Sequence, residues 1–334
     1  MLTESRWKHQ LKVVAHGQLA TLIDDAASYL QSKILETPVE PSPMLSRILG
    51  VPVWLKLESL QLTGSFKIRG AWFRLSRLTT AERACGILTC SAGNHGKAVA
   101  YAAKALGIRA TVCVPSSVDG AKFDGMTALG ADVRKSEFPG YDDTEVWARD
   151  LAEREGKPFI SPFDDLAIMA GNGGTLAGEV LNQAPEARIF VVPVGGGGLS
   201  AGFAYTVKAR QPNAILIGCQ HELSPGLKLS LEAGQAITRL PAIETVAGGV
   251  EGGIGELPFE VLRSRIDHVA LVSEEAIFEG VRWMLREHQY LIEPSAAVTI
   301  AACLTGSIGQ LRAPTAIVIS GRNVSLDVVR RILS

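Results

Sequence analysis

The 334-residue sequence lacks a hydrophobic run long enough to cross a membrane, and it lacks an excess of either charge. A spanning helix needs about 18 or more apolar residues in a row, and no apolar core of signal-peptide length follows the polar N-terminus. The 33 basic and 34 acidic residues give a net charge of −1 and form no long runs. We therefore expect a cytoplasmic protein that binds neither nucleic acid nor membrane.

Cysteine is scarce too, and its spacing is not that of a metal site. The five cysteines form no CxxC pair and lie mostly in apolar segments: Cys85, Cys90, Cys113, Cys219 and Cys303. This pattern favours buried free thiols over metal ligands or disulfides. We predict no metal site.

Strand-like and helix-like segments alternate along the chain in two sets. Residues 17–32 are predicted to be a helix, and residues 34–50 an extended arm in which prolines limit helix. Beyond residue 81, the segments GILTC, ATVCVP, ADVRKS and PFISP alternate with helices predicted over 94–106, 121–129 and 143–155. A second set has RIFVVPV, AILIGCQ, HVALVS and TAIVIS as strands. The alternation predicts an α/β fold of two α/β domains on mainly parallel, twisted sheets, with a site between them at the carboxyl ends of strands.

A lysine at a predicted strand-to-helix junction is the first candidate for chemistry. Lys67 follows the strand-like segment VPVWLKL and the small polar run at 63–65, and it opens an amphipathic helix. A lysine in a partly desolvated pocket loses its proton readily and can form a Schiff base. A lone lysine is more typical of a solvated helix face. A chemical role for Lys67 is therefore indicated only together with other motifs.

Two polar turns at predicted helix starts are suited to anions. The turn SAGNHG at 91–96 suits a carboxylate, and GGGG at 195–198 can curl backbone N–H groups around a phosphate. The glycine run also loosely suits a dinucleotide turn, with Glu222 as the ribose-binding acid, so an NAD-dependent oxidoreductase stays an alternative. GNHGK is not a P-loop, because Ser91 replaces the first glycine and Ala98 follows the lysine.

Together, a reactive lysine, a carboxylate-binding turn and a phosphate cup suit pyridoxal 5'-phosphate acting on amino acids. The chain resembles the tryptophan synthase β-like family (fold type II) of pyridoxal-phosphate enzymes, and within it the threonine/serine dehydratase and serine racemase group. The resemblance spans about residues 35–325 and includes KLESLQLTGSFKIRGA, SAGNHG, SPFDD, VGGGGLSAG, LIEPSAA and SGRNV. It implies a large cofactor-binding domain over 1–80 and 161–334, a small mobile α/β domain over 81–160, and a homodimer.

The resemblance also implies roles for individual residues. Lys67 would form the internal aldimine and move the proton at the substrate Cα. The cofactor ring would be contacted by Phe66 at its side, Asn94 at its hydroxyl and Ser320 at its pyridine nitrogen. The phosphate would accept hydrogen bonds from the backbone of Gly195, Gly196, Gly197, Gly198 and Leu199. The substrate carboxylate would lie in the loop of Ser91, Ala92, Gly93, Asn94 and His95.

The implied reaction is a β-elimination. The Ser320 hydroxyl cannot hold a proton on the ring nitrogen as a carboxylate would, which disfavours a long-lived carbanion and favours quick loss of a β-substituent. We expect a dehydratase or ammonia-lyase that removes water and then ammonia from an L-threonine or L-serine type substrate, through an aminoacrylate, to give a 2-oxo acid. Ala92 stands where racemases have serine, so a serine racemase ranks lower. A β-replacement enzyme like cysteine synthase remains a rival, and Lys67 argues against a non-catalytic cofactor-binding protein.

Some residues depart from the family pattern. Gln220 stands where a cation-binding carboxylate is common, with Ser224 and Gly226 as the further ligand positions, so the cation site should be weakened or lost unless Glu222 substitutes. His221 and Glu222 lie at a predicted strand end and are expected in surface or loop roles, with support of the site residues from behind as the alternative. Glu293, in LIEPSAA, matches a family position near the cofactor, with an ordering of its loop alone as the alternative. Trp283 is expected in the core or a subunit interface.

Two glycine-rich segments bear on substrate size. GNGGT carries Asn172 where the familiar turn reads GQGT, with one glycine inserted at 173 or 174, and AGGVEGGIG at 247–255 has Gly252 and Gly253 where serine-like residues are common. These departures predict a more open pocket, which would admit a bulkier 3-hydroxy amino acid such as a phenylserine or a hydroxyectoine breakdown product.

Overall fold

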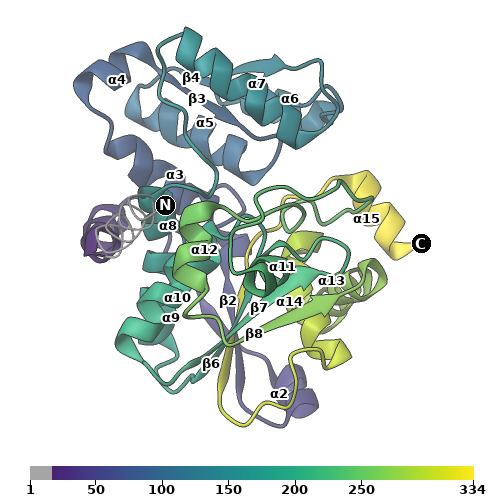
Figure 1. Cartoon of the computed structure of the whole chain (residues 1–334). Helices are drawn as coiled ribbons and strands as arrows, with labels where there is room; N and C mark the ends of the chain where they lie inside the picture. The colour runs from purple at the N-terminus through teal and green to yellow at the C-terminus, as the bar shows by residue number, and fades with distance from the viewer. Residues whose placement is uncertain (1–16) are drawn as a thin grey trace.

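The computed structural model describes residues 17–334, so the N-terminal segment considered above for a signal peptide lies outside the described residues. The chain forms two lobes, each built on its own sheet (Figure 1). The six-stranded sheet has the order β1-β2-β9-β6-β7-β8, and only the pairing of β1 with β2 is antiparallel. The three-stranded sheet, of order β3-β4-β5, is wholly parallel. The predicted α/β fold with mainly parallel sheets is confirmed.

The strands are short and mostly buried. They are β1 (Val39–Pro41), β2 (Val53–Leu57), β3 (Ile87–Cys90), β4 (Ala110–Val114), β5 (Asp132–Lys135), β6 (Ile189–Pro193), β7 (Ile215–His221), β8 (His268–Val272) and β9 (Thr315–Ile319). Every residue of β3, β4, β6 and β9 is buried. Runs of this kind are expected where helices cover both faces of a parallel sheet.

Helices connect and cover the strands. A helix over residues 17–30 comes first in the described chain. The others are α2 (Pro43–Leu49), α3 (Lys67–Ser76), α4 (Thr80–Cys85), α5 (Asn94–Leu106), α6 (Gly120–Ala128), α7 (Tyr141–Arg154), α8 (Leu166–Met169), α9 (Thr175–Gln183), α10 (Gly198–Arg210), α11 (Gly226–Ala233), α12 (Glu256–Leu262), α13 (Glu274–His288), α14 (Pro294–Thr305) and α15 (Leu326–Leu333). A 3-10 turn, η1 (Glu58–Leu60), and a π-helical turn, η2 (Ala170–Gly174), complete the set.

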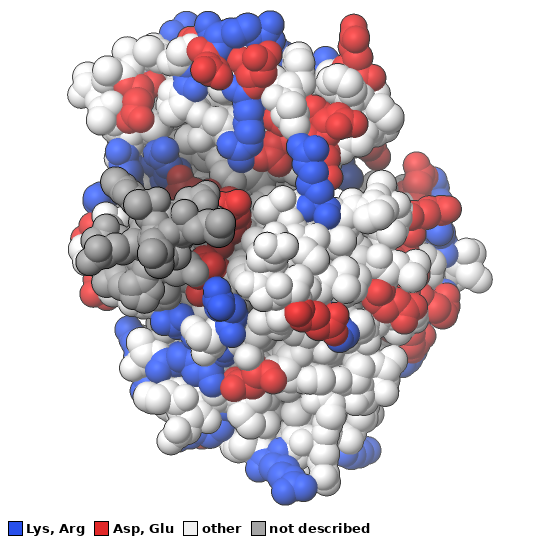
Figure 2. Space-filling model, in the orientation of Figure 1, with Lys and Arg blue, Asp and Glu red and all other residues white. Residues whose placement is uncertain are grey.

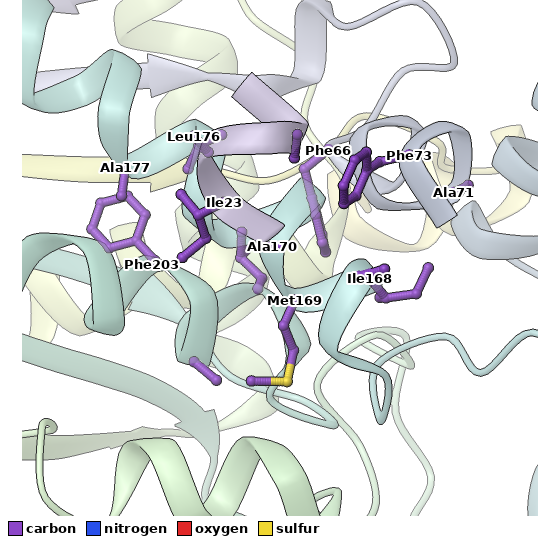
Figure 3. Packing of buried hydrophobic residues seen from close by; sticks show 14 of the residues in the cluster. Ile23, Phe66, Ala71, Phe73, Ile168, Met169, Ala170, Leu176, Ala177 and Phe203 are labelled. Atoms are coloured by element: carbon purple, nitrogen blue, oxygen red, sulfur yellow. The ribbon is translucent and has the colours of Figure 1, made fainter. Parts of the chain in front are cut away.

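The larger apolar core joins α3, η2 and α10. Figure 3 shows part of it, with Phe66 and Phe73 from the α3 region on one side of Ala170 and Phe203 of α10 on the other. Trp283, 4% exposed, lies in a second core beside the six-stranded sheet, as predicted. On the surface drawn in Figure 2, acidic and basic side chains are interspersed.

Two predictions of local structure were wrong. The segment PFISP forms no strand, since only Phe159 makes an isolated parallel bridge, to Leu88. The arm predicted to be extended contains α2, because Ser42 caps the helix by accepting the Leu45 N–H at 3.4 Å and Pro43 occupies its first turn. The predicted helix over 94–106 coincides with α5, and the domain limits at residues 80 and 160 stay a prediction.

The five cysteines all lie in the described chain and are free thiols. Cys90, Cys113, Cys219 and Cys303 are buried free thiols, whereas Cys85 is an exposed one. Between residues 17 and 334, no helix is both long enough and apolar enough to traverse a bilayer.

Candidate active site

Lys67 begins α3, as the sequence predicts, and its side chain is only partly exposed. Its Nζ donates a hydrogen bond of 2.8 Å to the carbonyl oxygen of Pro162 and lies 5.2 Å from the ring centre of Phe66. Burial lowers the pKa of Lys67 to about 8, and the charge of Glu293 opposes this shift. An unusually large fraction of this amine is therefore neutral, and nucleophilic, near neutral pH.

The first turn of α5 offers backbone donors in the loop after β3. Within the described chain, the N–H groups of residues 94–96 make no hydrogen bond, and the N–H of Gly93 is held by Ser91 Oγ at 3.2 Å. Unpaired N–H groups at a helix N-terminus attract anions. His95 is 2% exposed, and burial, assisted by the charge of Lys67, lowers its pKa to about 3. Its ring is therefore neutral, so a carboxylate would find backbone donors here and no imidazolium charge.

The glycine run forms a second set of donors at the carboxyl end of β6. In residues 17–334, the backbone N–H groups of residues 195–200 donate no hydrogen bond. Gly197 has φ of +90°, a conformation that favours glycine. A Cβ at Gly195 would overlap the backbone carbonyl of Gly249. The loop therefore requires its glycines, and it presents a cluster of unpaired donors at the start of a 13-residue helix.

The segment SPFDD links Lys67 to this glycine loop. Pro162 accepts the Lys67 hydrogen bond, and the next residue, Phe163, packs on the loop. A Cβ at Gly198 would lie 2.8 Å from Phe163 Cα, which shows how closely the two segments approach. Lys67 and the glycine loop are therefore connected through one segment, although they are far apart in the sequence.

Asn94 is held in a polar cluster with Glu293 and Asn323. Its Nδ2 donates to Glu293 Oε1 at 2.7 Å and to Oε2 at 3.0 Å, and its Oδ1 accepts a bond of 2.7 Å from Asn323 Nδ2. Glu293 is 7% exposed, and burial raises its pKa to about 7. The Ser320 carbonyl accepts the Phe66 N–H at 3.1 Å, which joins this cluster to the start of α3.

Sequence reasoning gave no role to Asn323, and for Glu293 it left open a position near the cofactor or a role in ordering its loop. The motif SGRN places an asparagine three residues after Ser320, and this was the available signal. Its contact with Asn94 could not be inferred, because 229 positions separate the two residues.

Several buried polar atoms around Lys67 have no partner in the described chain, namely Ser65 Oγ, Thr63 Oγ1 and His95 Nδ1. Buried polar groups normally form hydrogen bonds. Orphaned atoms beside a partly neutral amine and two clusters of free N–H donors fit a polar, anionic cofactor with an aldehyde. The residues present therefore fit pyridoxal phosphate.

The side chain of Gln220, at the position where a cation-binding carboxylate is common, is bonded within the protein. Gln220 is fully buried; its Nε2 donates to the Val194 carbonyl at 3.3 Å and its Oε1 accepts the Lys228 N–H at 3.1 Å. Glu222 is exposed. In the part of the chain that the structure describes, no three His, Cys, Asp or Glu side chains gather as metal ligands would. The surface or loop role predicted for His221 was wrong, because its ring is buried and lies 3.1 Å from Glu274.

The GNGGT segment lines no open space. Residues 171–174 are buried within η2, and a Cβ at Gly171 would lie 2.7 Å from Gly70 Cα. The prediction that this insertion opens the pocket was wrong, since these glycines allow backbones to pack against each other. In the second segment, Gly253 packs against the backbone of residues 238 and 239, whereas a Cβ at Gly252 would meet no atom within 4 Å.

Comparisons with known proteins agree with this geometry. The family described as "Pyridoxal-phosphate dependent enzyme" matches residues 30–321. The chain is 35% identical to the L-threonine ammonia-lyase of Thermotoga maritima over 313 residues, covering 93% of this chain and 77% of that protein. The processed form of threonine deaminase isoform 2 from Solanum lycopersicum has a TM-score of 0.88 at 31% identity, covering 95% of this chain and 88% of the other. Serine racemase from Dictyostelium discoideum has a TM-score of 0.84 at 31% identity, covering 92% and 98%.

Proposed function

The chain belongs to the family of pyridoxal-phosphate dependent enzymes, and within it we propose that it is a dehydratase of a 3-hydroxy amino acid of the L-threonine or L-serine type. It removes water and then ammonia and leaves a 2-oxo acid. The observation that carries the proposal is the partly buried Lys67 amine, bonded to the segment that packs on a glycine loop with unpaired N–H donors. The similarity to an L-threonine ammonia-lyase and to a threonine deaminase supports it.

The residues that would hold the cofactor come from separate segments. The N–H groups of residues 195–199 would bind its phosphate, and Phe66 would pack beside its ring. Asn94 would face the ring hydroxyl, oriented by Glu293, and Ser320 would face the pyridine nitrogen. When bound, pyridoxal phosphate supplies an aldehyde that joins to amines and a ring that withdraws electrons from the substrate Cα.

Lys67 carries the proton in this proposal. Its Nζ takes the proton from the substrate Cα, which a neutral amine can do and an ammonium cannot. With a pKa of about 8, about a tenth of the amine is neutral at pH 7, against less than about a thousandth for an ordinary lysine. The loop at 91–95 would fix the substrate carboxylate through backbone donors and so orient the Cα–H bond.

Serine racemisation is the second candidate, because a serine racemase has a similar structure. It needs an acid on the face of the substrate opposite Lys67. Ala92 has no hydroxyl to serve there, which is why dehydration is preferred. We also propose that the protein is a cytoplasmic homodimer and that the lobe built on β3–β5 moves as the small domain.

The proposal is tested by incubating the cofactor-loaded protein with L-threonine, L-serine and phenylserine and measuring the release of 2-oxo acid and ammonia. Release from L-threonine or L-serine, abolished in Lys67→Ala, is the expected result. Release from phenylserine alone would transfer the activity to bulkier substrates. No release from any of them, with the visible absorption of bound cofactor present, would overturn the dehydratase assignment in favour of racemisation or β-replacement.

A further inference from the structure

The π-helical turn η2 lies between the helix that begins with Lys67 and the helix that follows the glycine loop. Thr175 donates its N–H to the Ala170 carbonyl, five residues back, which is the hydrogen-bond pattern of a π-turn. All five residues of η2 are buried. Single π-turns occur mostly as one-residue insertions and often lie at functional sites. The extra glycine of GNGGT is accommodated in this way.

η2 contacts the backbones of both helices directly. A Cβ at Gly171 would lie 2.7 Å from Gly70 Cα and 2.8 Å from the Arg69 carbonyl, both on α3. On the other side, a Cβ at Gly202 of α10 would lie 2.8 Å from the N atom of Gly174. Figure 3 shows the same arrangement at the side-chain level, with Ala170 of η2 between Phe66 and Phe203. The distance between the Lys67 helix and the helix of the glycine loop is therefore set by η2.

Asn172 makes the polar contact between η2 and α3. Its side chain is fully buried, and its Oδ1 accepts the N–H of Gly70 at 2.8 Å. In an undistorted helix, Gly70 would donate to the carbonyl of Phe66, four residues back. That carbonyl instead accepts the Arg69 N–H at 3.0 Å, a tighter bond of the 3-10 type. The side chain of Asn172 thus replaces the first α-helical hydrogen bond of α3.

The replacement matters because Lys67 lies in this turn. Phe66, at the N-cap position, has no side-chain hydrogen bond to offer the helix, so the turn depends on a partner from elsewhere. Without Asn172, the Gly70 N–H would turn to the Phe66 carbonyl, and the first turn would rewind from 3-10 to α geometry. That change would redirect the Lys67 side chain, whose position is otherwise fixed by the bond to Pro162.

We propose that Asn172 is a positioning residue for Lys67: by accepting the Gly70 N–H, it keeps the first turn of α3 tight and sets where the lysine amine lies. The length of its side chain is matched to the π-turn. Only 2.6 Å separates Asn172 Oδ1 from where a Cβ of Gly70 would be, so a longer amide does not fit. A normal α-turn would withdraw residue 172 from α3, and the longer glutamine would then be needed to reach it.

The first test is Asn172→Leu, which keeps the side-chain size and removes the acceptor. The rate at which the cofactor-free protein captures pyridoxal phosphate is followed by visible absorption over a range of pH. Capture does not require a substrate, so its outcome is independent of the proposed dehydratase activity. Losing a buried hydrogen bond changes an equilibrium constant by about tenfold. We therefore expect the rate of cofactor capture to fall by about tenfold and the pH at which capture is half-maximal to shift.

Thr206→Val is the matched control. Thr206 is also buried, and its hydroxyl donates to the Gly174 carbonyl at 3.3 Å, on the side of η2 facing away from α3. The control should lower the melting temperature while leaving the capture rate and its pH midpoint unchanged. If Asn172→Leu captures the cofactor at the wild-type rate and pH midpoint, Asn172 has only a structural role and the proposal is refuted.

A second experiment keeps the proposal testable if Asn172→Leu does not fold. Asn172→Gln and deletion of Gly173 are made separately and together. Each change alone should impair cofactor capture, because one crowds Gly70 and the other withdraws the acceptor. Together they should restore capture, since a longer amide on a shorter turn reaches the same N–H. A combined variant no better than either single one would refute the matched geometry.

Discussion

Replacing Lys67 with methionine should stabilise the cofactor-free protein, and the size of the gain should depend on pH. The pKa of Lys67 is lowered from 10.5 to about 8 by burial, so between these values the unfolded chain binds a proton that the folded chain does not. In this range the stability of the wild type rises with pH. Below about pH 8 both states are protonated, and the penalty for the buried ammonium is fully present.

The expected size follows from the two pKa values. Their difference corresponds to about 3 kcal/mol in total, of which about 2 kcal/mol falls between pH 8 and pH 10. Methionine does not titrate, so the difference in unfolding free energy between the variant and the wild type should shrink by that amount over this interval. The lost hydrogen bond to Pro162 contributes equally at both pH values and cancels.

The assay is urea unfolding of both cofactor-free proteins at pH 8 and pH 10, followed by far-UV circular dichroism. All other groups that titrate in this range are common to the two proteins, so only the difference between them is interpreted. A difference that is the same at both pH values would mean that Lys67 titrates like a solvated lysine. Lys67 would then lack the neutral amine that the proposed proton transfer requires.

Three further changes test other parts of the site. The added Cβ of Gly195→Ala would overlap the Gly249 carbonyl. This variant should raise the dissociation constant for pyridoxal phosphate at least about tenfold, measured by absorbance titration. In the control Gly248→Ala the added Cβ has no atom within 4 Å, so the dissociation constant should not change. Glu293→Gln removes a carboxyl whose pKa is raised to about 7. Because His95 titrates in the opposite sense in the same range, the test is the difference between the two proteins: the wild type should lose stability relative to the variant as pH rises from 4.5 towards 7, which melting temperatures of both proteins would show. Arg69→Leu leaves the fully buried carboxylate of Glu58 without its ion-pair partner and should lower the unfolding free energy by about 3–5 kcal/mol in urea denaturation; a loss below about 1 kcal/mol would contradict this.

Much of the fold could be predicted because its signals are local. The limits of α5 follow from a glycine turn at its start and Gly107 at its end, and the buried strands are continuous apolar runs. The start of α2 is also encoded locally, in Ser42 followed by Pro43, but the nearby Pro38 and Pro41 favour an extended chain. PFISP has strand composition, yet it meets the sheet edge only at Phe159, and no local pattern shows how far a pairing extends.

In the candidate site, too, the features set by local sequence could be predicted and the long-range contacts could not. The positions of Lys67 and of the glycine loop at helix starts follow from the sequence around them. The contacts of Asn94 with Glu293 and Asn323, and of Asn172 with Gly70, join positions 102 to 229 residues apart. The inserted glycine was visible in the sequence, but an insertion can lengthen a loop or bulge a helix. The packing of η2 between two helices shows that this insertion bulges a helix and does not lengthen a loop.

The start of α3 combines a destabilising residue with strong external anchors. A partly buried ammonium at Lys67 opposes folding, and the helix has no cap of its own. Two residues later, the fully buried Arg69 forms paired hydrogen bonds of 2.6 to 2.8 Å with both Glu58 and Glu179. Because a broken buried ion pair is strongly destabilising, this cluster resists any movement of the turn. Arg69 thus fixes the side chain face of the turn while Asn172 fixes its backbone, and a lysine of lowered pKa is held where an unanchored helix end would fray.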